Sequence, residues 1–251
     1  MSTLYRNPSI LLNSIENWLR EKLRAAGEKG GIVGLSGGID SAVVAAILKR
    51  VCGDRMMTVI MPCHSHPEDR LHAELVARHF ELPLIVVDLT AAYDTLLAAF
   101  PAAGIEGAKL AAANLKPRLR MSTLYYLAQE RNLLVCGTGN RVELTVGYFT
   151  KYGDSGVDLL PLGDLLKGEV RQLASLLGVP APVIDKPPSA GLWQGQTDEG
   201  EMGVTYDELD RYLARGEGHE KVRDFVERSR TRSEHKRNMP PFCRIGETKQ
   251  A

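Results

Sequence analysis

Residues 30–51 read GGIVGLSGGIDSAVVAAILKRV, and this stretch decides the fold. Gly31–Leu35 is short, apolar and partly β-branched, which predicts a buried strand. Ser36–Gly38 is too rich in glycine for either regular element and predicts a turn. Asp40–Val51 is an apolar segment of helical length. A strand, a glycine turn and a helix in succession open a parallel α/β unit.

The same alternation continues along the chain. An amphipathic helix at Pro8–Ala26 precedes this stretch, with Leu and Ile recurring at helical spacing. Further elements follow it: strands at Met56–Met61, Leu84–Val87 and Leu133–Cys136, and helices at Pro67–Phe80, Thr90–Phe100, Lys116–Arg131 and Glu169–Leu177. Short apolar strands separated by helices are typical of a parallel sheet covered on both faces. Right-handed crossovers then predict an α/β fold, an open doubly wound parallel sheet with helices on both faces.

The chain changes character after Pro180. Ile184–Gly203 holds prolines, glycines and the acidic run DEGE, which predicts a long loop. Two short helices are predicted at Tyr206–Arg215 and Glu220–Arg230, and the polar segment from Ser233 is predicted to be extended. The sequence contains no internal repeat and no composition typical of a domain linker. We therefore expect a single domain over residues 1–251, with a C-terminal loop and helical appendage from about residue 181.

Composition excludes several classes of protein. The 251 residues are 44% hydrophobic and 25% charged, as in a globular protein with a sizeable core. Lys plus Arg and Asp plus Glu both total 31, so the formal net charge is zero and we expect no nucleic-acid partner. The sequence has no apolar run of ~18 residues, so we expect no membrane span. Four scattered cysteines without C-x-x-C spacing fit reduced thiols and a cytoplasmic location.

The octet Gly34–Ser41, GLSGGIDS, carries the clearest chemistry. Backbone amides in a glycine turn, together with the positive end of a helix, form a cradle for phosphate. The two central glycines allow close approach of the backbone, and the two serines add hydroxyl groups. Asp40 has the wrong charge for phosphate, so it implies a bridging Mg²⁺. The octet lacks the Gly-Lys-Ser/Thr of a Walker A loop, and a plain strand-to-helix turn is the alternative interpretation.

A second set of polar residues follows the fourth predicted strand. Thr138 offers a hydroxyl, and Glu143 lies on the next helix near the carboxyl end of that strand. Ligands bind at this edge of an open parallel sheet, so Glu143 is placed to share a metal with Asp40. Lys151 and Lys167 supply cations that the glycine loop lacks, although each alone is more typical of a solvated surface.

The octet resembles the pyrophosphate-binding loop S-G-G-x-D-S of the PP-loop ATP pyrophosphatases, which cleave ATP between its α and β phosphates. Other segments make the chain similar to one branch of that superfamily, the ammonia-dependent NAD synthetases. The matching segments are RLRM at 118–121, GTGNRVE at 137–143, GYFTKYGD at 147–154, KPPSA at 186–190, QTDEGEMG at 196–203 and SEHKR at 233–237. The resemblance runs from the first helix to about Arg237.

This resemblance implies an adenine nucleotide alpha hydrolase-like fold and a ligase that amidates deamido-NAD⁺ to NAD⁺. ATP and ammonia are consumed through an adenylated nicotinate carboxylate, and AMP and pyrophosphate are released. The implied ATP contacts are Gly34, Leu35, Ser36, Gly37, Gly38, Ile39, Asp40, Ser41, Thr138, Lys167 and Ser189, and the implied Mg²⁺ ligands are Asp40 and Glu143. The implied deamido-NAD⁺ contacts are Arg118, Lys151, Asp158, His235 and Lys236. Asp40, Lys151 and Lys167 are the expected catalytic residues, and a homodimer is the expected assembly.

The chain departs from the family's pattern at two places. Gly139-Asn140 stands where many members have Asp-His, and Ser189 stands where Thr is frequent. The alternative functions are a GMP synthetase ATPase subunit, a tRNA-modifying enzyme and a non-catalytic nucleotide sensor. The zero net charge disfavours tRNA, the FTKYGD and SEHKR segments disfavour GMP synthesis, and a sensor would be expected to lose Asp40 or Glu143. No residues remain for an amidohydrolase domain, so free ammonia is the expected nitrogen donor.

Overall fold

The structure, a computed structural model, describes residues 4–102, 109–189, 191, 193, 195–243 and 245. A sheet in the order β3-β2-β1-β4 forms its centre. The strands are β1 (Gly30–Gly34), β2 (Met57–Ile60), β3 (Leu84–Val86) and β4 (Leu133–Val135). All neighbouring strands are parallel, with Ile32 of β1 opposite Met57 of β2 and Val135 of β4. The parallel sheet predicted from the sequence is confirmed.

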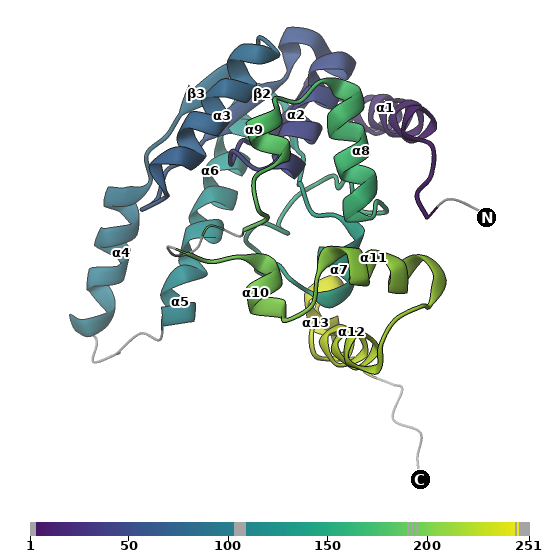
Figure 1. The fold of residues 1–251 in the computed structure, drawn as a ribbon. Helices are drawn as coiled ribbons and strands as arrows, with labels where there is room; N and C mark the ends of the chain where they lie inside the picture. The colour runs from purple at the N-terminus through teal and green to yellow at the C-terminus, as the bar shows by residue number, and fades with distance from the viewer. Residues whose placement is uncertain are drawn as a thin grey trace.

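Helices cover both faces of this sheet (Figure 1). One face packs against α1 (Pro8–Ala26), α2 (Ile39–Cys52), α3 (Pro67–His79), α8 (Lys167–Leu177) and α9 (Ala181–Ile184). The other face packs against α4 (Thr90–Ala102) and α6 (Leu115–Arg131), and α5 (Lys109–Ala113) contacts α6. A 3₁₀ turn, η1 (Gly53–Arg55), joins α2 to β2. The doubly wound arrangement is therefore confirmed as well.

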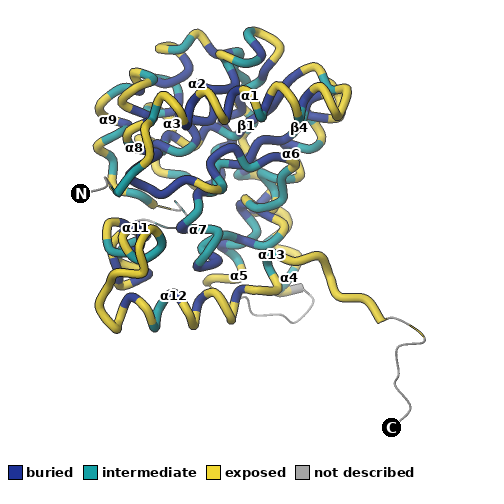
Figure 2. The backbone as a smooth tube through the Cα atoms, turned by 90° about the vertical axis from the view of Figure 1, so that its right-hand side faces the viewer, coloured by how far each residue is buried: buried dark blue, intermediate teal, exposed yellow. Residues whose placement is uncertain are grey.

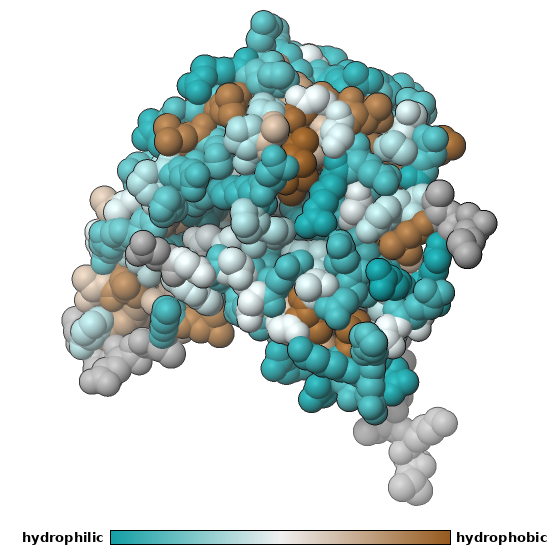
Figure 3. Space-filling view, viewed as in Figure 1, coloured by the Kyte–Doolittle hydropathy of each residue, from teal (hydrophilic) through white to brown (hydrophobic). Residues whose placement is uncertain are grey.

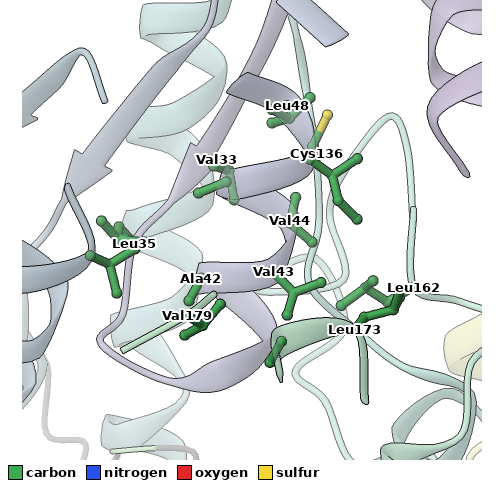
Figure 4. Packing of buried hydrophobic residues seen from close by; sticks show 14 of the residues in the cluster. Val33, Leu35, Ala42, Val43, Val44, Leu48, Cys136, Leu162, Leu173 and Val179 are labelled. Carbon is green, nitrogen blue, oxygen red and sulfur yellow. The ribbon is translucent and has the colours of Figure 1, made fainter. Parts of the chain in front are cut away.

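The alternation of strand side chains divides the core into two layers. Ile32 belongs to the layer formed with α4 and α6, whereas Val33, the next residue, belongs to the layer formed with α1, α2 and α8. Figure 4 shows Val33 beside Val44 of α2, with Leu173 of α8 in the same layer. Successive side chains of a strand point to opposite faces, so a strand between two helical layers must be apolar throughout.

A third apolar cluster lies at the end of the molecule away from α1. It joins α7 (Arg141–Val146) to α10 (Asp198–Met202), α11 (Tyr206–Arg215) and α12 (Glu220–Arg232), and α13 (Glu234–Arg237) follows α12. Figure 2 shows this group below the sheet, with buried positions facing inward and exposed positions outward. Because α7 follows β4 directly, this cluster is tied to the carboxyl edge of the sheet.

The predicted elements agree with the structure to within about two residues at most ends, and four short helices of the described residues were not predicted. These are α5, α9, α10 and α13. Helix α9 lies just after Pro180, where the preceding helix was predicted to stop, and α10 lies within the predicted long loop. Thr197 caps α10 by accepting from Gly200 N–H, and acids fill its first turn, which stabilises a helix despite its glycine. The prediction that the segment from Ser233 is extended is wrong for Glu234–Arg237, which forms α13.

The surface carries scattered rather than continuous apolar patches in the view of Figure 3. Three strongly exposed apolar side chains, Met239, Phe242 and Ile245, lie on the segment that follows α13. Of the helices in the described part of the chain, none combines the length and the apolar character that crossing a bilayer requires.

The packing of α8 against α2 generates a stability prediction. Leu173 of α8 is fully buried, whereas Leu176 on the same helix is 47% exposed. We expect Leu173→Ala to lower the free energy of unfolding by ~2–5 kcal/mol, because it leaves a cavity between α8 and α2. Leu176→Ala, the matched control, should cost less than ~1 kcal/mol. Urea unfolding followed by circular dichroism measures both, and equal losses would contradict the packing described here.

Candidate active site

The loop after β1 is held in shape by its own serines. Ser41 Oγ donates to Gly38 O (2.9 Å), accepts from Ser36 N–H (3.2 Å) and lies 3.1 Å from Ser36 Oγ. Gly37 has a φ of +79°, and a Cβ there would lie 2.2 Å from the carbonyl oxygen of Asp69. Glycine is therefore required at position 37 both by the backbone conformation and by the approach of α3.

This loop leads into the N-terminus of α2 without a side-chain cap. The N-cap residue is Gly38, which makes no side-chain hydrogen bond to the first turn. The amide groups of a first helical turn have no partner inside the helix, and the helix dipole is positive there. This end of α2 has the electrostatic character of an anion site, as the octet predicted.

The segment after β4 brings Glu143 to the same place. Asn140 and Glu143 form a capping box at the start of α7, in which each side chain accepts from the other residue's backbone N–H (3.1 Å in both directions). The side-chain amide of Asn140, which is fully buried, also donates to Asp40 Oδ1 (3.2 Å). The two acids that the sequence predicted to share a metal are therefore linked through one asparagine.

Lys167, the first residue of α8, completes the centre. Its side chain is buried, and its Nζ lies 2.5 Å from Asp40 Oδ2 and 3.9 Å from Glu143 Oε1. The ammonium group also lies over the ring of Tyr206, 4.9 Å from the ring centroid. The three charged groups predicted for ATP and metal binding thus meet within one cluster, drawn from α2, α7 and α8.

Burial and mutual charge shift the titration of this cluster. Burial, reinforced by the charge of Asp40, raises the pKa of Glu143 to about 8. Burial alone would lower the pKa of Lys167, but the carboxylates of Asp40 and Glu143 outweigh it and raise that pKa. Burial also raises the pKa of Asp198, whose Oδ1 has no hydrogen-bond partner in the described part of the chain. One lysine therefore faces three acids at this centre.

A cavity of about 1450 Å³ opens beside the cluster. Most of the predicted site residues line it: Gly34, Leu35, Ser36, Gly38, Ile39, Asp40, Ser41, Arg118, Thr138, Glu143, Lys151, Lys167, Ser189, His235 and Lys236. Gly37 and Asp158 do not appear in that lining. The carboxylate of Asp158 instead accepts from Val135 N–H (2.8 Å) and from the hydroxyl of Tyr125 (3.0 Å), so it ties β4 to α6.

The FTKYGD and SEHKR segments meet at another part of the cavity wall. Lys151 Nζ donates to the carbonyl of His235 (2.6 Å). Lys236 Nζ donates to the carbonyls of Gly147 (2.8 Å) and Phe149 (2.7 Å), and burial lowers its pKa. Two segments more than 80 residues apart in sequence thus form one surface.

Lys186 and Glu201, near the two ends of the 186–203 segment, each contact a residue outside the segment. Lys186 Nζ lies 2.5 Å from Asp69 Oδ1 of α3, and Asp198 N–H donates to Pro188 O (3.0 Å). The hydroxyl of Tyr148 donates to Glu201 (2.8 Å), which lies near the other end of the segment. Described residues of this segment therefore line the same cavity as the loop after β1.

Sequence reasoning missed three residues of this site: Asn140, Asp198 and Tyr206. An N-cap residue followed three positions later by Glu is the pattern of a capping box, so Asn140 could have been found in NRVE. Asp198 lies within a quoted motif, and no separate signal marked its burial. Tyr206 gives no local signal, because an aromatic residue at the start of an amphipathic helix is typical of core packing.

Nucleotides bind parallel sheets where neighbouring strands connect in opposite directions, and β1 and β4 are such a pair. The uncapped helix end, the acids and the buried lysine all lie at that point. The fold and the site together define a nucleotide-binding α/β enzyme of the PP-loop type.

Comparison with known proteins identifies the family. Residues 11–241 match the family model NAD synthase. The chain is 55% identical over 225 residues to the NH(3)-dependent NAD(+) synthetase of Carboxydothermus hydrogenoformans, covering 89% of this chain and 93% of that protein. It is 50% identical to the enzyme of the same name from Syntrophomonas wolfei, covering 95% and 97%. A solved structure of NMN synthetase from Francisella tularensis superposes with a TM-score of 0.91 at 36% identity, covering 96% and 100%. The chain belongs to the NAD synthase family.

The raised pKa of Glu143 predicts a pH-dependent stability. Between about pH 4.5 and pH 8 the folded protein holds a proton on Glu143 that the unfolded chain has released, so stability falls as pH rises through this window. Glu143→Gln removes the titration. We expect the free energy of unfolding of Glu143→Gln, relative to the parent protein, to increase by ~2 kcal/mol or more from pH 5 to pH 9.

Urea unfolding in the presence of a chelator measures this difference. Glu130→Gln, at an exposed position on α6, is the matched control. Its free energy of unfolding should change with pH in the same way as that of the parent protein. If the free energy of unfolding of Glu143→Gln also changed with pH as that of the parent protein does, the raised pKa of Glu143 would be contradicted.

Proposed function

We propose that this chain amidates the nicotinate carboxylate of deamido-NAD⁺, using ATP and ammonia and releasing NAD⁺, AMP and pyrophosphate. The observation that carries the proposal is the convergence of Asp40, Glu143 and Lys167 at the uncapped start of α2, within a chain of the NAD synthase family. The curated relatives of 50–55% identity bear the name of that activity.

The chemistry explains why such a centre is needed. A carboxylate resists ammonia, because its negative charge repels a nucleophile and oxide is a poor leaving group. Attack of the carboxylate oxygen on the α-phosphorus of ATP forms an acyl-adenylate and breaks the bond to pyrophosphate. Ammonia then attacks the acyl carbon, AMP departs, and a proton is lost from nitrogen to give the amide. Positioning and charge stabilisation carry this route, so it requires no nucleophile from the protein.

The residues divide into two groups along the cavity. The amides at the start of α2, with Ser36, Thr138 and Ser189, would bind the phosphates and the rest of ATP, and Lys167 would stabilise negative charge that develops during adenylation. Arg118, Lys151, His235 and Lys236 line the part of the wall assigned to deamido-NAD⁺. Lys236 already has two carbonyl partners, so we assign it to shaping that wall.

We also propose that the site takes Mg²⁺. Hard carboxylate oxygens suit this cation, and Mg²⁺ is usually held by one or two carboxylates together with substrate phosphates. Asp40 and Glu143 fit that requirement, and the unpartnered Oδ1 of Asp198 leaves negative charge to be balanced. The described residues contain no group of three or more His, Cys, Asp or Glu arranged around one ion, so phosphate oxygens would complete the shell. When bound, the cation would neutralise charge on the triphosphate.

The assembly and the location remain parts of the proposal. We propose a homodimer in which Asp158, outside the cavity lining, contributes to the dinucleotide site as the family resemblance implies. Cys52, Cys63 and Cys136 are free and buried and Cys243 is free and exposed, which fits reduced thiols in a cytoplasm.

A second candidate substrate is the mononucleotide. The protein of TM-score 0.91 is named as an NMN synthetase, and the same chemistry would amidate nicotinate mononucleotide. The two candidates share the adenylating centre and differ only in the wall that receives the second half of the dinucleotide.

A direct assay tests the function and chooses the substrate. We expect the purified chain with ATP, Mg²⁺ and ammonium to release AMP and NAD⁺ when deamido-NAD⁺ is added. Nicotinate mononucleotide, XMP and tRNA serve as parallel additions, with AMP release as the common measurement. Higher kcat/KM with the mononucleotide would select the second candidate, and turnover with XMP or tRNA alone would contradict both.

Asp40→Asn tests the proposed centre. It removes the closest partner of Lys167 and one of the proposed metal ligands. Loss of one charge-stabilising group often costs ~10²–10³ in rate, so we expect a fall of that size in NAD⁺ formation. Asp54→Asn, at an 86% exposed surface position, is the control and should retain full activity. Near-normal turnover by Asp40→Asn would refute the role of this carboxylate.

A further inference from the structure

Lys167 is held at its backbone by a residue from another helix. Asp210 of α11 is fully buried, and its carboxylate spans the first two amide groups of α8. Lys167 N–H donates to Oδ1 (2.9 Å) and Gly168 N–H donates to Oδ2 (2.7 Å). These amides begin a helix whose own N-cap residue, Leu166, has no polar side chain, so Asp210 supplies the cap from a distance of 43 residues in sequence.

The N-terminal segment closes the other side of this junction. The hydroxyl of Tyr5 hydrogen-bonds to Asp210, and a Cβ on Gly168 would lie 2.2 Å from the Tyr5 ring. Arg6 forms a two-pronged pair with Glu169, the third residue of α8, at 2.8 and 2.7 Å. The start of α8 is thus fixed by contacts on several sides, and its first side chain has little freedom to move.

The side chain of Lys167 is supported by the same helix that supports its backbone. Tyr206, one helical turn before Asp210 on α11, is fully buried beneath the Lys167 ammonium. Its hydroxyl donates to Asp198 Oδ2 (2.9 Å) and lies 3.4 Å from Glu143 Oε1. Residues four apart share one face of a helix, so this face of α11 contacts Lys167 at both ends.

We propose that α11 positions Lys167 for adenylation, with Asp210 fixing its backbone and Tyr206 fixing its ammonium group against Asp40. This inference rests on the proposed function and adds two positioning residues, neither of which belongs to the cavity lining. The third apolar cluster anchors α11 through Leu209, so the helix is a rigid support. Because misplacement of a catalytic group by ~1 Å can cost 10²-fold in rate, the support matters to turnover.

Asp210→Asn is the first test. The amide keeps the shape of the side chain but offers one oxygen in place of two, so one of the two N–H groups of α8 loses its acceptor. We expect kcat to fall by ~10-fold or more with KM for ATP changed less than ~2-fold, because Lys167 acts in the transition state. Asp207→Asn is the matched control: Asp207 is 70% exposed on the same helix and pairs only with Arg171 among the described residues.

Two further variants separate positioning from general destabilisation. Tyr206→Phe keeps the ring under the ammonium and removes only the hydroxyl, and we expect kcat to fall ~3–10-fold. Leu82→Ala removes a buried side chain from the cluster that contains α2 and α3 and leaves the cluster that anchors α11 intact, so it should lower Tm and leave kcat unchanged. Unchanged kcat in Asp210→Asn, or an equal loss of kcat in Leu82→Ala, would overturn the proposal.

A crystal structure of Asp210→Asn decides the matter independently of turnover. We expect the Lys167 ammonium to lie more than ~4 Å from Asp40, beyond ion-pair distance, whereas Asp207→Asn retains the contact. An unchanged ion pair in Asp210→Asn would overturn the positioning role even in an active enzyme. If the parent protein amidates no substrate, the proposed function fails while this structural comparison still tests the role of α11.

Discussion

The buried ion pair between Lys167 and Asp40 is the interaction on which the rest of this structure depends. Removing an ammonium and a carboxylate from water costs several kcal/mol for each ion, and their attraction offsets that cost only when the geometry is good and the remaining polar atoms are satisfied. This requirement explains the shell around the pair: Asn140 donates to Asp40, and Tyr206 lies under Lys167. Each partner comes from a different element, so the site and the tertiary fold are formed together.

The sheet order supplies the place where those elements can meet. The chain segments that follow β1 and β4 leave these two strands in opposite directions. The loop after β1 and the capping box after β4 therefore face each other across a crevice at the carboxyl ends of the two strands. A parallel sheet also directs the start of α2 toward this crevice, with its amides unpaired. The proposed phosphate site would therefore follow from the topology of the sheet, and its side chains would decide the chemistry.

The sequence predicted the local parts of this arrangement, and most of its candidate site residues line the cavity. The strand, turn and helix of residues 30–51 were predictable because hydrophobic period and glycine placement act over short range. Asp210 and Tyr206 were not predictable in their roles, because both have the pattern of a core-facing helix and their partners lie about 40 residues away. The short helix α10 was missed because Gly200 suggested a loop, while the Thr197 cap and the first-turn acids outweighed it. Local sequence therefore predicts secondary structure well, except where a cap or a partner distant in sequence outweighs the local preference.

The charge balance at the centre constrains how substrates can bind. Asp40, Glu143 and Asp198 face a single lysine, and a triphosphate would add more negative charge at the same point. Burial and the charge of Asp40 raise the pKa of Glu143, so a second carboxylate charge beside Asp40 is disfavoured. A bound divalent cation would instead favour that charge, because a metal ligand must be deprotonated. A proton and the proposed cation would therefore compete for Glu143, and we expect the nucleotide to bind together with its cation rather than before it. A second lysine at this centre would neutralise the acids before the substrate binds, and the phosphates could then bind without a cation. Such a centre would stabilise the bound ATP and the transition state about equally, so it would contribute less to the rate of adenylation.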